Sequence, residues 1–230
     1  LASHPPLASH PPLASHPPLA SHPPPAYHPP FLGPASQRPD MDPQAVRSTL
    51  ADRVDAVRAD LHDRWGEVRH RRRDPLAVTD HEFPDDPDAV FPWVAVAFVV
   101  EDGAVLLVRD AGHDHEWEPP GGKGEPAETP AETAEREVRE ETGVDAAVTD
   151  LLFTETLPFD YGAPVTAPVL QAGFVARRSE GRACGNEDRI EAAGWFPLDD
   201  LPDGTQFRAD LDDLRRSATP AGDGPSEGRR

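Results

Sequence analysis

Residues 122–144 read GKGEPAETPAETAEREVREETGV, and this stretch decides how the chain folds and where its chemistry lies. A Pro-Gly-Gly turn precedes it at 120–122. Residues 129–132, Thr-Pro-Ala-Glu, have the form of a helix capping box with proline in the first turn. Gly143 is the residue type that most often ends a helix in a left-handed conformation. The pattern therefore predicts a helix over 130–142.

Three acids of this predicted helix lie side by side. They are spaced at i, i+3 and i+4, which places neighbouring side chains on one face: Glu137, Glu140 and Glu141. An apolar stripe, formed by Ala131, Ala134 and Val138, lies roughly 100° around the helix and lets it dock on a sheet. Adjacent carboxylates repel one another unless a cation lies among them, and hard oxygen ligands favour Mg2+ or Mn2+. Such ions neutralise phosphate oxygens and activate water.

The residues around the acids fit the same chemistry. Gly121 and Gly122 let the backbone approach a metal ion or a phosphate closely. Arg136 has the planar guanidinium that holds a neighbouring carboxylate through two hydrogen bonds. The stretch therefore predicts a divalent-cation site that acts on phosphate groups.

The pattern G-x5-E-x7-R-E-V-x-E-E-x-G-V, read from Gly122 to Val144, resembles the signature motif of the Nudix hydrolases at every fixed position. The resemblance implies an α/β fold, an α/β/α sandwich with a mixed sheet, over residues 91–217. It also implies metal-dependent hydrolysis of a pyrophosphate bond in a nucleoside diphosphate linked to another group. The alternative is a non-catalytic Nudix-fold module that binds nucleotides or regulates. The full set of acids favours the enzyme.

The resemblance also implies roles for single residues. Catalytic roles fall to Glu137, Arg136 and Glu141, with Glu137 the candidate general base and Arg136 orienting it. The metal ligands implied are Glu137, Glu140, Glu141 and the carbonyl of Gly121, holding Mg2+ or Mn2+. Glu128 is implied as an acid tied to the motif. A further acid is expected from a later loop, and Glu187 and Glu191 are the candidates, because residues 195–202 resemble the segment that follows that loop.

Residues that resemble those of particular Nudix branches favour three different substrates. Pro158 is placed as in ADP-ribose pyrophosphatases, and Tyr161 as in hydrolases of dinucleoside polyphosphates. Lys123, after the Gly-Gly pair, resembles the branch that acts on nucleoside triphosphates. Phe159 and Tyr161 are aromatic and suited to stacking on a base. The predicted substrate-binding residues are Gly122, Lys123, Phe159 and Tyr161, and the choice among the three substrates stays open.

The net charge of −20 limits the partners of the chain. Lys123 is the only lysine, so 21 of the 22 basic residues are arginine. Such acidity argues against general binding to nucleic acids or membranes and leaves a small nucleotide as the expected partner. It is typical of halophile proteins, and the alternative is an acidic protein from a GC-rich genome. A single cysteine, Cys184, and an apolar run of only eight residues at 93–100 indicate a cytoplasmic protein without a membrane span.

Both ends of the chain have a composition unlike that of a packed domain. Residues 1–24 are four copies of LASHPP, whose paired prolines favour extended polyproline II. Met41 is the only methionine, so we expect residues 1–40 to be a disordered leader, or a translated upstream repeat that is not native. Residues 218–230 are rich in glycine, proline and serine and predict a disordered tail. Residues 41–90 are expected to form a helical extension and a linker.

The extension predicts one long helix over 43–73. Its apolar residues recur at steps of three and four and would pack on the chain's own domain or on a second copy in a homodimer: Leu50, Val54, Val57, Leu61, Trp65 and Val68. The arginines 71–73 would then lie at the helix C-terminus, where the dipole favours cations. They alternatively form a patch for substrate phosphate or an acidic partner. Residues 74–88 predict a linker.

Strands are predicted on both sides of the central helix. A hairpin joins 93–100 to 104–109 through Glu101-Asp102-Gly103. A short strand near Trp117 leads into the Gly-Gly turn. Further strands are expected at 147–157, 169–177 and 190–196, followed by a last helix at 205–216.

Overall fold

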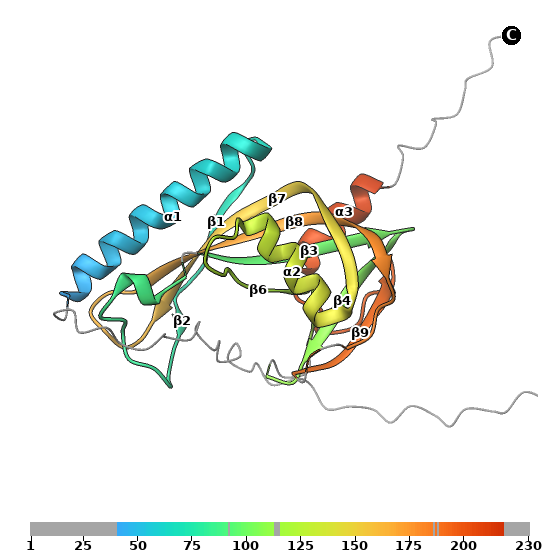
Figure 1. Ribbon diagram of the computed structural model, residues 1–230. Helices are drawn as coiled ribbons and strands as arrows, with labels where there is room; N and C mark the ends of the chain where they lie inside the picture. The colour runs from blue at the N-terminus through green and yellow to red at the C-terminus, as the bar shows by residue number, and fades with distance from the viewer. Residues whose placement is uncertain (1–40, 92, 113–115, 186, 188, 219–230) are drawn as a thin grey trace, which may run out of the picture.

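The computed structural model describes residues 41–218, except 92, 113–115, 186 and 188. The leader 1–40 and the tail from 219 onward lie outside the described residues, so their predictions stay untested. The elements are α1 (Pro43–Trp65), β1 (His70–Arg72), β2 (Leu76–Ala77), η1 (Pro87–Ala89), β3 (Trp93–Glu101), β4 (Ala104–Asp110), β5 (Trp117–Glu118), β6 (Gly121–Lys123), α2 (Pro130–Thr142), β7 (Val144–Asp160), β8 (Ala167–Gly181), β9 (Ile190–Pro197) and α3 (Arg208–Ala218). Figure 1 shows their arrangement.

The strands form one mixed sheet, as predicted. Its order within the described residues is β1-β7-β8-β3-β4-β5, with β2 beside β7, β6 beside β3 and β9 beside β4. The central pair, β3 and β8, is parallel, whereas β7 pairs with β8 in antiparallel fashion. The long β7–β8 ribbon carries the sheet beyond the predicted strand ends on both sides.

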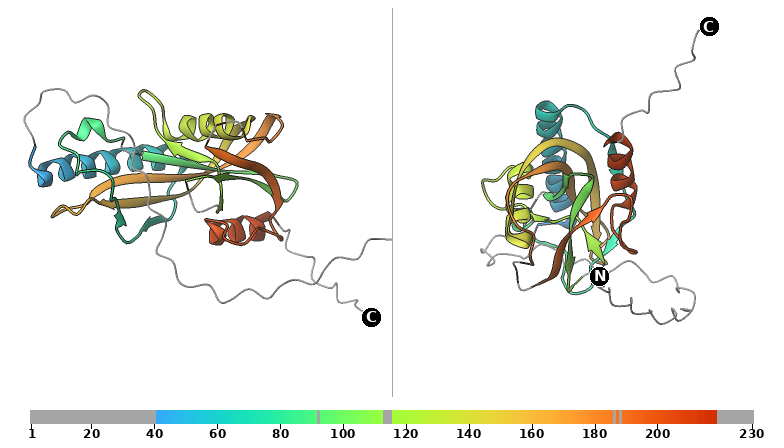
Figure 2. Two further views of the ribbon diagram at one scale, coloured as in Figure 1. Left: turned by 90° about the horizontal axis from the view of Figure 1, so that it is seen from below. Right: turned by 90° about the vertical axis from the view of Figure 1, so that its right-hand side faces the viewer.

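Helices cover both faces of the sheet. Figure 2 shows α2 and α3 on opposite sides of it. Side chains of α1 and α2 share one buried cluster with Ala95, Ala97 and Val99 of β3. The alternate residues of β3, Val96 and Phe98, are buried in another cluster with Leu211 of α3. Successive residues of a strand point to opposite faces, so β3 contributes to a core on each side. The predicted α/β/α sandwich is confirmed.

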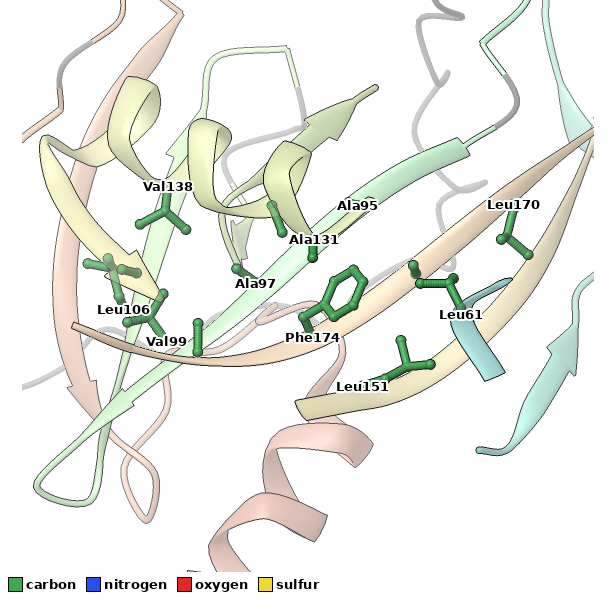
Figure 3. Close-up of a cluster of buried hydrophobic side chains, with 14 of the residues drawn as sticks. Leu61, Ala95, Ala97, Val99, Leu106, Ala131, Val138, Leu151, Leu170 and Phe174 are labelled. Carbon is green, nitrogen blue, oxygen red and sulfur yellow. The ribbon is translucent and has the colours of Figure 1, made fainter. Parts of the chain in front are cut away.

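The central helix α2 forms as its sequence predicts. Thr129 and Glu132 exchange both hydrogen bonds of the capping box, and Gly143 ends the helix at a φ of 69°. The predicted apolar stripe is buried, with Ala134 and Val138 inaccessible to solvent. Figure 3 shows Ala131 and Val138 pointing from α2 toward the sheet. The helix is thereby fixed, and two of its acids, Glu137 and Glu141, face β6.

The β3–β4 hairpin also follows its sequence. Asp102 and Gly103 have φ values of 49° and 78°, as a type I′ turn requires. Glu101 pairs with Ala104 across that turn. The last helix begins at Arg208, later than the predicted residue 205.

The extension helix ends earlier than predicted. α1 begins at Pro43 as expected but ends at Trp65, because Gly66 at a φ of 90° turns the chain away. Residues beyond it form β1, which lies parallel to β7. The prediction of a helix to residue 73 was wrong, because the apolar Val68 continues a helical spacing that the glycine interrupts.

This early end changes the role of the arginines. Arg71 lies on β1, so the prediction that it lies at a helix C-terminus was wrong. It donates two hydrogen bonds to the buried Asp210 of α3, and its guanidinium lies 4.0 Å from the ring centroid of Phe153. Arg73 lies 3.3 Å from Glu155 of β7. Both arginines therefore bind acids of the chain's own domain.

The predicted linker at 74–88 is partly structured. Leu76 pairs with Phe159 at the start of β2, and η1 forms a single turn at Pro87–Ala89. A linker prediction missed them because neither element is longer than three residues. The described residues contain no helix long and apolar enough to cross a bilayer.

The apolar stripe of α1 packs on the chain's own domain. Val54 and Leu61 are buried in one cluster, against which Val57, Trp65 and, beyond the helix, Val68 are partly buried, and Leu50 is buried in a second cluster. Of the two predicted partners of the stripe, the structure shows the chain's own sheet.

Shortening one of these side chains will test how firmly the extension is held. Leu61→Ala should lower the free energy of unfolding by about 2–5 kcal/mol, because Leu61 is only 4% exposed and the cavity would not refill. Asp52→Ala, on the exposed side of the same helix, is the control and should change it by less than about 0.5 kcal/mol. Urea unfolding of both variants measures the difference. Equal stability would show that α1 is loosely attached.

Candidate active site

The candidate site lies where the backbone of β6 meets the acids of α2. The N–H of Gly121 donates a hydrogen bond to Oε2 of Glu141, at 3.1 Å. A Cβ on Gly122 would overlap the carboxylate of Glu137. The two glycines thus let a strand run directly against two carboxylates, whereas the Gly-Gly pattern predicted a close approach of the backbone to a metal ion or a phosphate.

Arg136 joins four parts of this site. Its Nε donates to Oε1 of Glu128 at 2.7 Å, and its Nη2 donates to the carbonyl oxygen of Lys123 at 2.9 Å. Its Nη1 is shared by Glu137 at 2.9 Å and Glu140 at 2.8 Å. The predicted role of Arg136, orienting Glu137, agrees with this geometry. One guanidinium fixes the loop, the helix and the strand together.

Glu128 is held as an acceptor from three directions. Besides Arg136, the hydroxyl of Thr133 donates to it at 2.8 Å and the N–H of Glu125 at 2.9 Å. Hydrogen bonds from Arg136 lower the pKa of Glu128 to about 2. The carboxylate is therefore charged at neutral pH and anchors the loop before α2.

Glu137 and Glu141 are buried carboxylates. Glu137 is 5% exposed and Glu141 is 1% exposed. Burial raises the pKa of Glu141 to about 8, although the charge of Arg189 opposes the rise. Burial likewise raises the pKa of Glu137, against the opposing effect of Arg136. Two buried carboxyl groups, each with a raised pKa, therefore lie close together. A positive charge beside them would stabilise their ionised forms.

Arg189 supplies such a charge in this structure. It comes from the segment before β9 and hydrogen-bonds Glu141 and Asp110 through its two Nη atoms. Its Nη2 also lies 3.8 Å from Oε2 of Glu137. Its Nε donates to Glu187 at 2.9 Å. A planar cation therefore lies between the two buried acids of α2.

The structure places some of the predicted site residues near Glu137 and Glu141 and others elsewhere. Glu187 reaches the acids through Arg189, whereas Glu191 lies 3.1 Å from Arg109, in another ion pair. The side chain of Glu140 is 44% exposed and bonded to Arg136. Among the described residues, no three acids, histidines or cysteines converge as a complete metal-binding group. The acids are held by the arginines instead.

A cleft of about 430 Å3 opens beside the acids. Glu141, Arg189, Gly121 and Gly122 line one part of it, and the side of the sheet opposite α2 lines the rest, through Val94, Val96, Leu157 and Gln171. A volume in this range suits a small-molecule site.

The two predicted stacking aromatics lie outside this cleft. Phe159 is fully buried in a core cluster with Leu157 and Val169. Tyr161 is half-buried and packs edge-on against Phe83, with ring centroids 5.9 Å apart. The structure therefore does not bring either ring to the candidate site. Lys123 contributes its carbonyl oxygen, to Arg136.

Three residues of the site carried no sequence signal. Asp110 and Arg189 come from segments 79 residues apart and meet only because β4 pairs with β9. Gln171 lies in the apolar first half of β8, between Leu170 and Ala172. Only the pairing of the strands places these residues at the cleft.

Filling the space of Gly122 will test the close approach of strand and helix. Gly122→Ala should lower the free energy of unfolding by about 1–3 kcal/mol, because its Cβ would overlap the Glu137 carboxylate. Gly194→Ala on β9 is the control, since its nearest neighbour would lie at an ordinary 3.5 Å. Thermal and denaturant unfolding of both variants gives the comparison. A stable Gly122→Ala variant would show that Glu137 is free to move aside.

Comparisons with known proteins agree with the motif. The NUDIX domain model matches residues 91–216, more than half of the chain. The chain is 30% identical over 136 residues to NAD-capped RNA hydrolase NudC of Chromobacterium violaceum, covering 56% of this chain and 49% of that protein. It is 30% identical over 128 residues to RNA pyrophosphohydrolase of Xanthomonas axonopodis pv. citri, covering 56% of each. The chain thus spans about half the length of these curated relatives.

A solved structure gives a further comparison. The MutT NUDIX hydrolase from Burkholderia pseudomallei is 28% identical, with 53% of this chain and 95% of that chain covered and a TM-score of 0.43. The match of the family model over the whole region from β3 to α3 is the finding that decides the family. The chain belongs to the NUDIX domain family.

Proposed function

We propose that this protein hydrolyses a pyrophosphate bond in a nucleoside diphosphate linked to another group, with the help of a divalent cation. The observation that carries the proposal is the pair of buried carboxylates, Glu137 and Glu141, set against the glycine backbone of β6 at the edge of a cleft. Family membership supports it, since similar chains are named as hydrolases of RNA caps and RNA pyrophosphates.

The acids fit a divalent cation in type, although no three of the described acids converge on one point in this structure. Glu137 and Glu141 already share a cationic neighbour, the guanidinium of Arg189. Carboxylate oxygens are the ligands that Mg2+ and Mn2+ prefer. Glu137, Glu140, Glu141 and the carbonyl of Gly121 would hold the cation. When bound, it would neutralise phosphate oxygens and lower the pKa of a water molecule.

The surrounding residues position these acids. Arg136 holds Glu137 in place and shares the same nitrogen with Glu140, so movement of one acid affects the other. Glu137 is our candidate for the general base, because its pKa is raised and it lies at the glycine turn. Arg189 must leave Glu141 for a cation to take its place. Its side chain is 46% exposed, so it has room to turn outward.

The substrate class is a small nucleotide. ADP-ribose, a nucleoside triphosphate and a dinucleoside polyphosphate all contain the proposed bond. The net charge of −20 disfavours long nucleic acids, which bind through phosphate contacts to basic surfaces. The relatives named for RNA substrates make a short 5′-triphosphate or NAD-capped oligonucleotide a necessary member of any substrate screen.

We also propose that the protein works in the cytoplasm of an organism that accumulates salt. The proposal rests on the excess of acidic residues, 42 against 22 basic ones. Repulsion among surface carboxylates is relieved by screening ions. The substrate screen should therefore be run in both dilute buffer and molar KCl.

Removing one buried acid tests the assignment of the site. Glu141→Gln should lower kcat about 100-fold or more, because it keeps the shape but removes a charged ligand. Glu180→Gln, on the exposed end of β8, is the control and should retain full activity. A chelator should abolish turnover by the parent protein, and Mg2+ or Mn2+ should restore it. Turnover by Glu141→Gln equal to that of the parent would favour the alternative, a non-catalytic nucleotide-binding module.

Binding of the cation should release protons. The pKa of Glu141 is raised to about 8, so below that pH its carboxyl group is protonated and must ionise before it ligates. The affinity for Mn2+ should therefore rise up to about ten-fold per pH unit as pH increases toward about 8, then level off. Calorimetry in buffers with different ionisation enthalpies counts the protons released. In Glu141→Gln the pH dependence should be weaker, and an affinity independent of pH in the parent would contradict the assignment.

A further inference from the structure

Gln171 is a buried polar side chain that the chemistry at the acids does not use. It lies on β8 in the middle of the sheet, opposite Val94 of β3 on one side and Glu155 of β7 on the other. It is 6% exposed and lines the cleft. Within the described residues, its Oε1 atom accepts no hydrogen bond. Buried amide groups are almost always paired, so an unpaired one in a cleft points to a missing ligand.

Glu155 lies opposite Gln171 in the sheet, and Arg73 lies next to Glu155. Glu155 is 5% exposed, and its Oε2 lies 3.3 Å from Nη2 of Arg73 without the geometry of a hydrogen bond. Arg73 lines the cleft and comes from the segment after β1, before the region that the family model matches. Gln171 and Arg73 line the cleft, and Glu155 lies between them behind its surface; the three residues, here called the Gln171 patch, come from three segments.

Apolar side chains line much of the cleft, together with Glu116, Glu118 and Gln206. Val94, Val96, Leu157, Leu76 and Phe207 line the same cleft, which continues to Gly121 and Glu141. A ligand that fits has a flat apolar body with a polar edge and an arm that extends toward the acids. A nucleobase joined through ribose to phosphate has this form.

The charges favour a base over a phosphate at the Gln171 patch. The arginine there is already paired with Glu155, so the patch has little net positive charge to offer. Gln171 is neutral and offers one acceptor and two donors on the same group. Rotation about its last torsion, which has a broad energy minimum, turns the buried oxygen toward the cleft.

We infer that Gln171 binds the edge of an adenine base and selects adenine over guanine nucleotides. Adenine places its 6-amino donor next to the ring nitrogen N7, and a glutamine carboxamide matches this N7 edge with two hydrogen bonds. The N7 edge of guanine carries two acceptors, N7 and O6, so it would leave the glutamine oxygen unpaired. The inference rests on the proposed function, because it takes the arm of the ligand to be the phosphate chain at Glu141.

The test measures binding of mononucleotides, which contain no pyrophosphate bond to hydrolyse. Calorimetry of the full chain with excess Mg2+ should show AMP binding at least about ten-fold more tightly than GMP. Gln171→Met keeps the length of the side chain but loses both hydrogen bonds, so it should weaken AMP binding about ten-fold and remove the preference. Gln44→Leu, on the exposed start of α1, should leave both affinities unchanged.

A second comparison needs no variant. IMP differs from AMP in carrying an oxygen in place of the 6-amino group, so the parent protein should bind it about ten-fold less tightly. If Gln171→Met fails to fold, the comparison of AMP with IMP still tests whether the site selects adenine. Equal affinities for AMP and IMP, an unchanged preference in a folded Gln171→Met, or no binding of AMP by the parent would each overturn the inference.

The outcomes separate this inference from the proposed hydrolysis. Metal-dependent turnover that is lost in Glu141→Gln, together with equal binding of AMP and GMP, would uphold the hydrolase and remove the base site. A preference for AMP that depends on Gln171, without turnover of any pyrophosphate substrate, would uphold the base site and remove the hydrolase.

Discussion

The contact between the backbone of β6 and the carboxylates of α2 is the constraint on which the rest of the site depends. A strand and a helix approach this closely only where the strand has no side chain facing the helix, and Gly122 provides that position. Gly121 then donates its N–H to Glu141. Next to these acids on α2, the small stripe of Ala131 and Ala134 lets the helix lie close to β3. The same approach that buries the apolar stripe also buries the acids, because both lie on one short, rigid helix.

Burying acids has a cost that the arginines offset. An unpaired charge removed from water is strongly destabilising, whereas a charge held in a planar hydrogen-bonded pair is tolerated. Arg136 holds Glu128, Glu137 and Glu140, and Arg189 holds Glu141. Arg136 lies within the motif and is 17% exposed, whereas Arg189 comes from a distant segment and is 46% exposed. Arg136 is therefore the more enclosed of the two arginines, and Arg189 is the one that the proposed binding of a metal ion would displace.

The sequence was most informative where the determinants are local. The capping box, the apolar stripe and Gly143 predicted α2 to the residue, and the Asp102-Gly103 pair predicted the hairpin. Local patterns also gave the cluster around Arg136, since each of its members lies within 13 residues of Arg136. Phe159 and Tyr161 were assigned to substrate from their aromatic side chains and, for Tyr161, from its spacing after the motif, and Phe159 instead packs in the core. Burial depends on which strand lies opposite, and no local pattern records that pairing.

The same limit explains why the extension was misread. A helical spacing continued through Val68, but Gly66 ended the helix, and the residues that follow became an edge strand along β7. The replacement of the predicted helix by strand β1 also changes the surroundings of the cleft. As a helix, residues 66–73 would have left the edge of β7 unpaired, whereas as strand β1 they bring Arg71 to Asp210 of α3 and Arg73 to Glu155. The extension thereby completes the wall of the cleft farthest from the motif. The motif fixes the acids, and the segment before the matched region shapes the surface that a substrate's remaining group would contact.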